Sequence, residues 1–160
     1  MVTSWLRLVK GVIRTGYNIH KVTISPWCTA VQYNLDNAVT GVAPNYEINY
    51  PIVKFCKGEL SIPLDAMVTS LAGAELKFDW DSQFNVGFGA DTDKATIVVY
   101  NPDKGLFTLL TGAATRVAGT YTMQLPASYS GDEVHCYMSL LSADGQVSSD
   151  SVFVATITVL

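Results

Sequence analysis

The sequence predicts a mostly β protein, an antiparallel β-sandwich of about seven short strands preceded by an N-terminal helical hairpin. The period of the apolar residues supports this prediction. It is helical in the first part of the chain, and from about Ile48 apolar and polar residues alternate, as in half-buried strands. Turn residues separate the alternating segments at regular intervals. We therefore divide the chain into a helical lead-in, 1–47, and a β-sandwich domain, 48–160.

The lead-in contains two predicted helices. Residues 3–17 form an amphipathic helix whose apolar face holds Trp5, Leu8, Val9, Val12, Ile13 and Gly16. A second helix starts at Pro26, with Ser25 as its N-cap, and runs to about Val39. Gly41 and Pro44 follow as its stop signals. The side of this helix expected to be buried holds Trp27, Val31, Asn34, Leu35 and Ala38. The pattern leaves open whether these helices pack on the sandwich or on another chain.

The strands follow from alternation and from turn chemistry. We predict them at 52–62 (interrupted at Lys57-Gly58), 67–71 (a short edge segment), 75–80, 95–100, 106–111, 120–125, 134–140 and 151–159. The segment 95–100 is nearly all apolar, which is typical of a central strand. The turns 101–105 (NPDKG) and 143–145 (ADG) contain the residues that tight turns favour.

Charge is distributed unevenly along the chain, whose net charge is −4. Residues 1–60 carry six basic and three acidic side chains, a balance of +3, and residues 61–160 carry four basic and eleven acidic ones, a balance of −7. An acidic sandwich repels phosphates, which disfavours nucleic-acid binding through it. The opposite signs favour head-to-tail contact between copies, and an ordinary scatter of surface charge is the alternative.

The N-terminus does not resemble a signal peptide, because Arg7, Lys10 and Arg14 interrupt its apolar residues. No stretch is long and apolar enough to span a membrane. We expect synthesis in the cytoplasm, with the virion or the cell surface as later locations that remain open. The three cysteines have no metal-binding spacing, and we interpret them as small apolar core residues, with a disulfide as the alternative.

Two local stretches resemble a fibronectin type III domain, which has an immunoglobulin-like fold. The run 74–80 (AELKFDW) looks like the second strand of that fold, with Trp80 as its core tryptophan. The run 137–145 (YMSLLSADG), followed by Ser148 and Ser151, looks like its final hairpin. Sandwiches share such motifs for physical reasons, so this resemblance implies an architecture and no activity.

A longer series of motifs runs along nearly the whole chain: 25–27 (SPW), 33–41 (YNLDNAVTG), 45–50 (NYEINY), 57–60 (KGEL), 100–104 (YNPDK), 112–116 (GAATR), 131–134 (GDEV) and 142–145 (SADG). This series resembles a domain-of-unknown-function family that is widespread in Bacteroidetes bacteria and is also met in their phages or prophages. The family implies no known activity. Its members usually carry a further N-terminal segment rich in glycine and basic residues. This chain begins at the first helix, through a shortened start or through loss of that segment, so no role of the segment is carried over.

The search for chemistry yields no predicted catalytic residue, cofactor or metal site. His20 lies between the two predicted helices, and His135 is expected to face solvent or a sheet edge. Cys136 is the neighbour of His135, and adjacent strand residues point to opposite faces, so the two cannot pair. Four aspartates flank the loop 78–94, where Ca²⁺ is one interpretation, and caps and turns are the one that we prefer: Asp79, Asp81, Asp91 and Asp93.

The loop 81–93 is the preferred contact region, because the end loops of sandwiches commonly carry recognition sites. Its candidate contact residues are Phe84, Phe88, Asp91 and Asp93. The alternative is that both phenylalanine rings fold back over the end of the core.

Three functions remain to be compared. The favoured one is a non-enzymatic structural or assembly protein whose partners are copies of itself, and the family resemblance adds a phage virion or a surface fibre as its setting. The alternative is a monomeric binding module for a glycan or a host protein, which would use end-loop aromatic residues such as Phe84, Phe88 or Tyr129. An enzyme would need a convergent polar site that the sequence does not offer.

Overall fold

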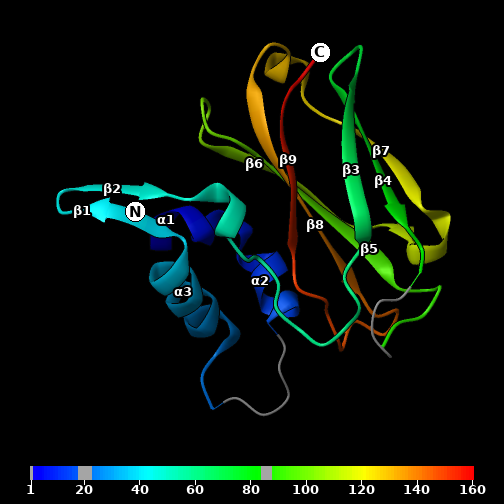
Figure 1. Ribbon diagram of the computed structural model, residues 1–160, viewed down its shortest axis with the longest axis horizontal. Coiled ribbons are helices and arrows are strands. Elements are labelled where there is room, and N and C mark those ends of the chain that lie inside the picture. The colour runs from blue at the N-terminus through cyan, green and yellow to red at the C-terminus, as the bar shows by residue number, and fades with distance from the viewer. Residues whose placement is uncertain (1, 18–22, 84–87) are drawn as a thin grey trace.

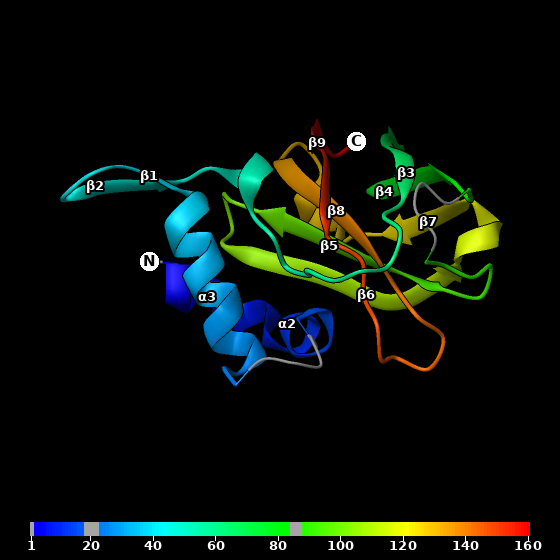
Figure 2. The same cartoon turned by 60° about the horizontal axis from the view of Figure 1, so that its bottom comes forward.

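The chain folds into three layers in a computed structural model that describes residues 2–17, 23–83 and 88–160. A three-stranded sheet packs on one face of a four-stranded sheet, and the N-terminal helices lie on the other face, as Figures 1 and 2 show. The C-terminus lies at the end of the sandwich remote from these helices. The predicted class, a mostly β antiparallel sandwich with a helical N-terminal part, is confirmed.

The first predicted helix is present and contains a tighter turn at its centre. It consists of α1 (Val2–Leu6), the 3₁₀ turn η1 (Arg7–Val9) and α2 (Lys10–Gly16). A 3₁₀ turn has about three residues per turn, so it shifts the apolar face relative to an uninterrupted α-helix. As a result Leu6 is buried and Leu8, which we expected to be buried, is 56% exposed.

The second helix, α3 (Pro26–Asn37), begins where the sequence predicts and ends two residues early. The hydroxyl of Ser25 accepts a hydrogen bond from the Cys28 amide at 3.2 Å, which confirms the predicted N-cap. Ala30 is fully buried in place of Leu35, which is exposed. The residues that were predicted to end the helix form a β-hairpin instead, made of β1 (Val39–Val42) and β2 (Asn45–Ile48).

The prediction of a first strand at residues 52–62 is wrong. The short turn η2 (Tyr50–Ile52) is followed by an extended segment that makes only a single-residue bridge to a neighbouring chain segment. Side chains take the place of a sheet ladder: the Lys54 amide donates to Asn34 Oδ1 at 3.0 Å, and the Phe55 amide donates to Ser151 Oγ at 2.9 Å. Val53, Phe55 and Cys56 are nevertheless buried, because the segment runs between α3 and the sheet.

Within the described part of the chain, seven strands make up the sandwich. They are β3 (Leu64–Leu71), β4 (Glu75–Asp81), β5 (Lys94–Asn101), β6 (Leu106–Thr115), β7 (Thr120–Gln124), β8 (Glu133–Leu141) and β9 (Val152–Thr158). The sheet orders are β3-β4-β7 and β6-β5-β8-β9, and every pairing is antiparallel. The predicted short edge segment at 67–71 is a full edge strand of eight residues. This division of seven strands into two sheets is the immunoglobulin-like arrangement.

Strands β5 and β8 are buried on both faces. Ile97 and Met138 point into the sandwich core, and Val98 and Tyr137 point into a second core beneath the helices. This is the reason that segment 95–100 lacks alternation. The helices therefore pack on the sandwich of their own chain. The division at residues 47 and 48 stays a prediction, because this second core joins both sides of it.

The structure also places the three cysteines, which are free thiols. Cys56 and Cys136 are buried, whereas Cys28 is exposed on α3, so the apolar interpretation holds for two of them. In the described ranges, none of the helices has the length and hydropathy needed to cross a bilayer.

Candidate functional site

An aromatic cluster fills the space between the N-terminal helices and the outer face of the four-stranded sheet. Its rings contact one another at centroid distances between 4.0 and 6.4 Å. They come from both halves of the chain: Trp5, Tyr50, Phe55, Tyr100, Phe107, His135, Tyr137 and Phe153. Most of these rings are buried and serve as core.

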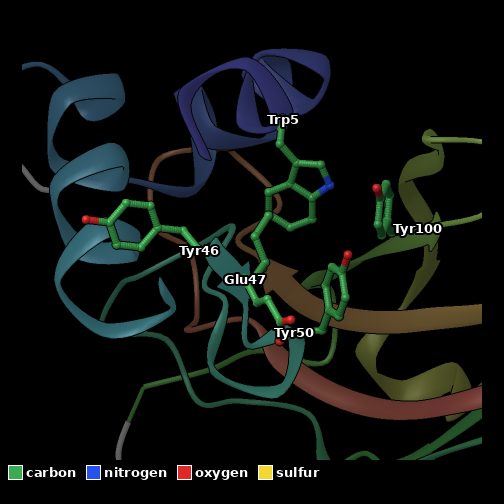
Figure 3. Close-up of a pocket in the computed structure, with 6 residues that line it drawn as sticks. Trp5, Tyr46, Glu47, Tyr50 and Tyr100 are labelled. Carbon is green, nitrogen blue, oxygen red and sulfur yellow. The ribbon is translucent and has the colours of Figure 1, made fainter. Parts of the chain in front are cut away.

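At one edge of the cluster lies a pocket of about 440 Å³, drawn in Figure 3. It sits at the base of the β1–β2 hairpin, where α1, η2 and β5 also meet. The lining residues are Trp5, Tyr46, Glu47, Ile48, Tyr50 and Tyr100. Because they come from four elements, the pocket exists only in the folded chain.

Three rings form the inner wall of this pocket. Tyr100 stands edge-on to Trp5 at 5.2 Å with an interplanar angle of 88°. Tyr50 lies 5.6 Å from Tyr100 and 6.1 Å from Trp5. Behind Tyr50, the ring of His135 stacks at 4.0 Å with an angle of 23°. Rings that pack against one another in this way hold fixed positions, so the wall is preorganised.

Three polar groups belong to the same pocket. The indole Nε1 of Trp5 is buried and has no hydrogen-bond partner within the described residues. Burial raises the pKa of the Tyr50 phenol, and the adjacent Tyr100 raises it further, so Tyr50 stays protonated at neutral pH. Glu47 is the lining residue with a formal charge, and its side chain is exposed at the rim. The pocket thus combines hydrogen-bond donors with one carboxylate acceptor.

His135 is not at the surface, contrary to the sequence-based expectation. It is 8% exposed, because Tyr50 covers it, and its Nδ1 lies 2.8 Å from the Thr156 hydroxyl. Burial lowers the pKa of His135, which favours the neutral ring. Cys136 points to the opposite face, into the sandwich core, as the strand period predicts. The second histidine, His20, lies outside the described residues.

The predicted contact loop is only partly described. Phe84 lies outside the described residues, whereas Phe88 is 65% exposed and Asp91 is exposed. Asp93 points inward: it is 2% exposed, and its Oδ2 lies 3.1 Å from the Arg116 guanidinium. Asp93 therefore holds the end of the sandwich together and does not present a contact surface. Tyr129, the further aromatic candidate, is buried at 2% exposure, which corrects that expectation.

The aspartates near this loop make local contacts. Asp79 pairs with Lys77 at 2.9 Å, and the side chain of Asp81 accepts from the Gln83 amide at 2.9 Å. The Asp81 contact fits the cap-and-turn interpretation, whereas Asp79 makes an ion pair within β4. In the ranges that the structure describes, no three side chains of the histidine, cysteine and carboxylate types gather in a metal-binding group.

Sequence reasoning missed the aromatic pocket. Its signal was the recurrence of large side chains at Tyr46, Ile48 and Tyr50, of which the first two lie in the strand β2 and Tyr50 begins the turn η2. That strand was absent from our prediction, and Trp5 and Tyr100 lie far from it in sequence. Tertiary packing alone brings these residues together.

The strand order defines an immunoglobulin-like sandwich with an added N-terminal layer. A family model described as a family of unknown function (DUF6266) matches residues 1–155, and the chain belongs to this family. Among solved structures, the chain is similar to the solution structure of the fn3 domain of human collagen alpha-1(XX) chain. That similarity has 18% identity and a TM-score of 0.45, and it covers 62% of this chain and 85% of the other. No curated protein matches the chain.

Proposed function

We propose that this protein is a non-enzymatic structural or assembly component whose partner is a further copy of the same chain. The β1–β2 hairpin carries the proposal. It projects beyond the body of the molecule in both Figure 1 and Figure 2, and its strands are exposed along most of their length. Its apolar side chains include Val42, which is 78% exposed.

A two-stranded hairpin is marginally stable in water unless a third strand or a packed face supports it. The hairpin also leaves strand edges open, and open edges favour pairing with another chain. Contact with a neighbouring molecule would supply both the missing strand and cover for Val42. A projecting arm of this kind suits head-to-tail assembly into rings or filaments.

Charge supports the same partner. The N-terminal part, which carries the hairpin, has a balance of +3, and residues 61–160 have a balance of −7. The hairpin itself carries only the negative charge of Glu47, so the attraction to the acidic part of the next copy would come from Arg7, Lys10 and Arg14 of the adjoining helices, and salt would weaken it. The family resemblance adds the setting: a phage virion or a surface fibre, with the virion or the cell surface as the location.

The test is the mass of the purified protein in solution by light scattering, over a range of concentrations and salt. We expect a defined oligomer or a growing polymer that dissociates as salt rises. Val42→Asp places a charge on the exposed arm and should weaken self-association at least tenfold, because burying an unpaired carboxylate costs more than about 1.4 kcal/mol. Val117→Asp is the matched control, since Val117 is 58% exposed in η3 (Arg116–Ala118), away from the hairpin. A monomer under every condition would refute assembly.

The second candidate function is a monomeric binding module for a glycan or a host protein. Exposed Phe88 and Asp91 at the end of the sandwich favour it, as does the aromatic pocket. Screening the full chain against immobilised glycans and host surface proteins tests this function. Phe88→Ala should abolish capture through the loop, and capture that survives this change would exclude the loop as the site.

A further inference from the structure

We infer that the pocket at the base of the β1–β2 hairpin binds a saccharide. The inference rests on the second candidate function and gives it a site and a ligand class. The pocket has a volume of about 440 Å³. Sites for small molecules measure about 300–1,000 Å³, so the pocket accommodates one or two sugar rings.

The rings around the pocket suit the apolar face of a pyranose. Tyr46 is 50% exposed at the rim, and Tyr50 is half-buried, with His135 stacked behind it at 4.0 Å. In Figure 3 the Tyr46 ring points away from Tyr50, so the Tyr50 ring is the surface that a sugar would cover, and covering it would remove its apolar surface from water.

The unpartnered donor of Trp5 indicates a ligand that carries an acceptor. The Trp5 side chain is 9% exposed, and its Nε1 lacks a partner in the described part of the chain. The indole N–H of Trp80, by contrast, donates to the Arg116 carbonyl at 2.9 Å. Figure 3 shows the Trp5 nitrogen on the side that faces Tyr100, and both residues line the pocket. Buried donors are nearly always paired, and a sugar hydroxyl or ring oxygen at this point would accept the missing bond.

The charge of the pocket distinguishes a sugar from other ligands. Glu47 supplies a carboxylate acceptor for hydroxyl donors, and the protonated Tyr50 phenol can both donate and accept. A purely apolar ligand would leave the buried Trp5 N–H without a partner, which is unfavourable, and would make no use of the Glu47 carboxylate at the rim. A cation would satisfy Glu47 but not the Trp5 N–H. A polyhydroxylated ring satisfies donors and acceptor together.

The experiment is an NMR titration of the ¹⁵N-labelled full chain with glucose, galactose, mannose and N-acetylglucosamine. The indole signal that disappears in Trp5→Phe belongs to Trp5. We expect at least one sugar to shift this signal downfield, as an N–H gaining an acceptor does. The Trp80 indole, already bonded to a carbonyl, is the internal control and should not move.

Variants then test the assigned contacts. Loss of one neutral hydrogen bond in Trp5→Phe should weaken binding about fivefold, and loss of a charge-assisted bond in Glu47→Gln about tenfold or more. Glu59→Gln removes another exposed carboxylate outside the pocket and should leave the affinity unchanged. Unchanged thermal unfolding of the variants shows that the fold is intact.

Two outcomes overturn the inference. The first is a Trp5 indole signal that none of the four sugars moves. The second is a shift caused only by the acetylated and amidated peptide of residues 42–45 (VAPN), which would assign the pocket to the hairpin of a second copy. The assembly proposal fails separately, in the light-scattering measurement with Val42→Asp.

Discussion

Replacing Ile13 with alanine tests whether the N-terminal helices and the sandwich unfold as one unit. Ile13 lies in α2, is completely buried, and belongs to the core that the helices share with β5 and β8. Removing a buried isoleucine side chain to Cβ costs about 2–5 kcal/mol, the sum of lost transfer free energy and of the cavity that remains. Domains are stable by about 5–15 kcal/mol in total, so the change is large.

The assay is native-state amide hydrogen exchange of the peptide that contains β4. This strand lies in the three-stranded sheet, whose core does not include the helices. If the chain unfolds as one unit, Ile13→Ala accelerates exchange in β4 by the full loss, from about thirtyfold to a few thousandfold. Val117→Ala, a change at an exposed side chain, should leave exchange unaltered.

Exchange in β4 that stays at the wild-type rate, while exchange in α1 and α2 accelerates, would show that the helices detach from a sandwich that stands alone. The division into 1–47 and 48–160 would then describe two folding units. Equal acceleration in both places would show that the boundary has no thermodynamic meaning.

Three further predictions concern buried polar groups. Asn34→Ala should lower the free energy of unfolding by about 2–4 kcal/mol in urea, because Asn34 satisfies both the amide and the carbonyl of Lys54; a loss below about 1 kcal/mol would contradict this role. Asp93→Asn takes the carboxylate from the buried Arg116 and should cost about 3–5 kcal/mol, measured as a fall in the thermal midpoint, whereas an unchanged midpoint would show that other contacts suffice. Burial holds the pKa of His135 below its ordinary value of 6.5, so the unfolded chain binds more protons just below that pH. The stability from His135 is therefore present above pH 6.5 and is lost as pH falls through the folded pKa. His135→Phe should make the urea midpoint of unfolding less dependent on pH between about pH 5 and pH 7.5. If the midpoint of the variant depends on pH as steeply as that of the wild type, another group is responsible for the titration.

The outcome for the strands shows where periodicity is informative. Segments 75–80 and 120–125 alternate because one face meets a core; 75–80 lies within β4, and β7 contains all of 120–125 except Leu125. Segment 134–140 lies within β8, where both faces are buried although polar and apolar residues alternate. Segment 52–62 alternates for the same reason as 75–80, since Val53 and Phe55 are buried, yet it is not a strand. Periodicity reports burial on one side of an extended chain, and it does not report whether the backbone pairs with a sheet or with side chains.

The hairpin beside the candidate site shows a second limit of prediction from sequence. The residues of the hairpin were read as a helix stop because Gly41 and Pro44 are common to both structures. The Gly41 backbone has φ +89°, and a Cβ there would collide with the Asn45 carbonyl, so glycine serves the tight hairpin rather than the end of a helix. A short pattern cannot separate these two uses, because both require only local backbone conformations.

The sequence by itself determined the class of fold, the helix starts and the position of most sandwich strands, since these depend on local period, capping and turn chemistry. It also determined the membership of a family, which depends on the order of motifs along the chain. Tertiary structure alone decided that the helices cover the outer face of the sheet, that His135 and Tyr129 are buried, and that Trp5 and Tyr100 meet at the base of the hairpin. The physical reason is the separation in sequence between the residues that interact. Hydrogen bonds within a turn join residues three or four positions apart, whereas the contact between Trp5 and Tyr100 depends on how two layers pack.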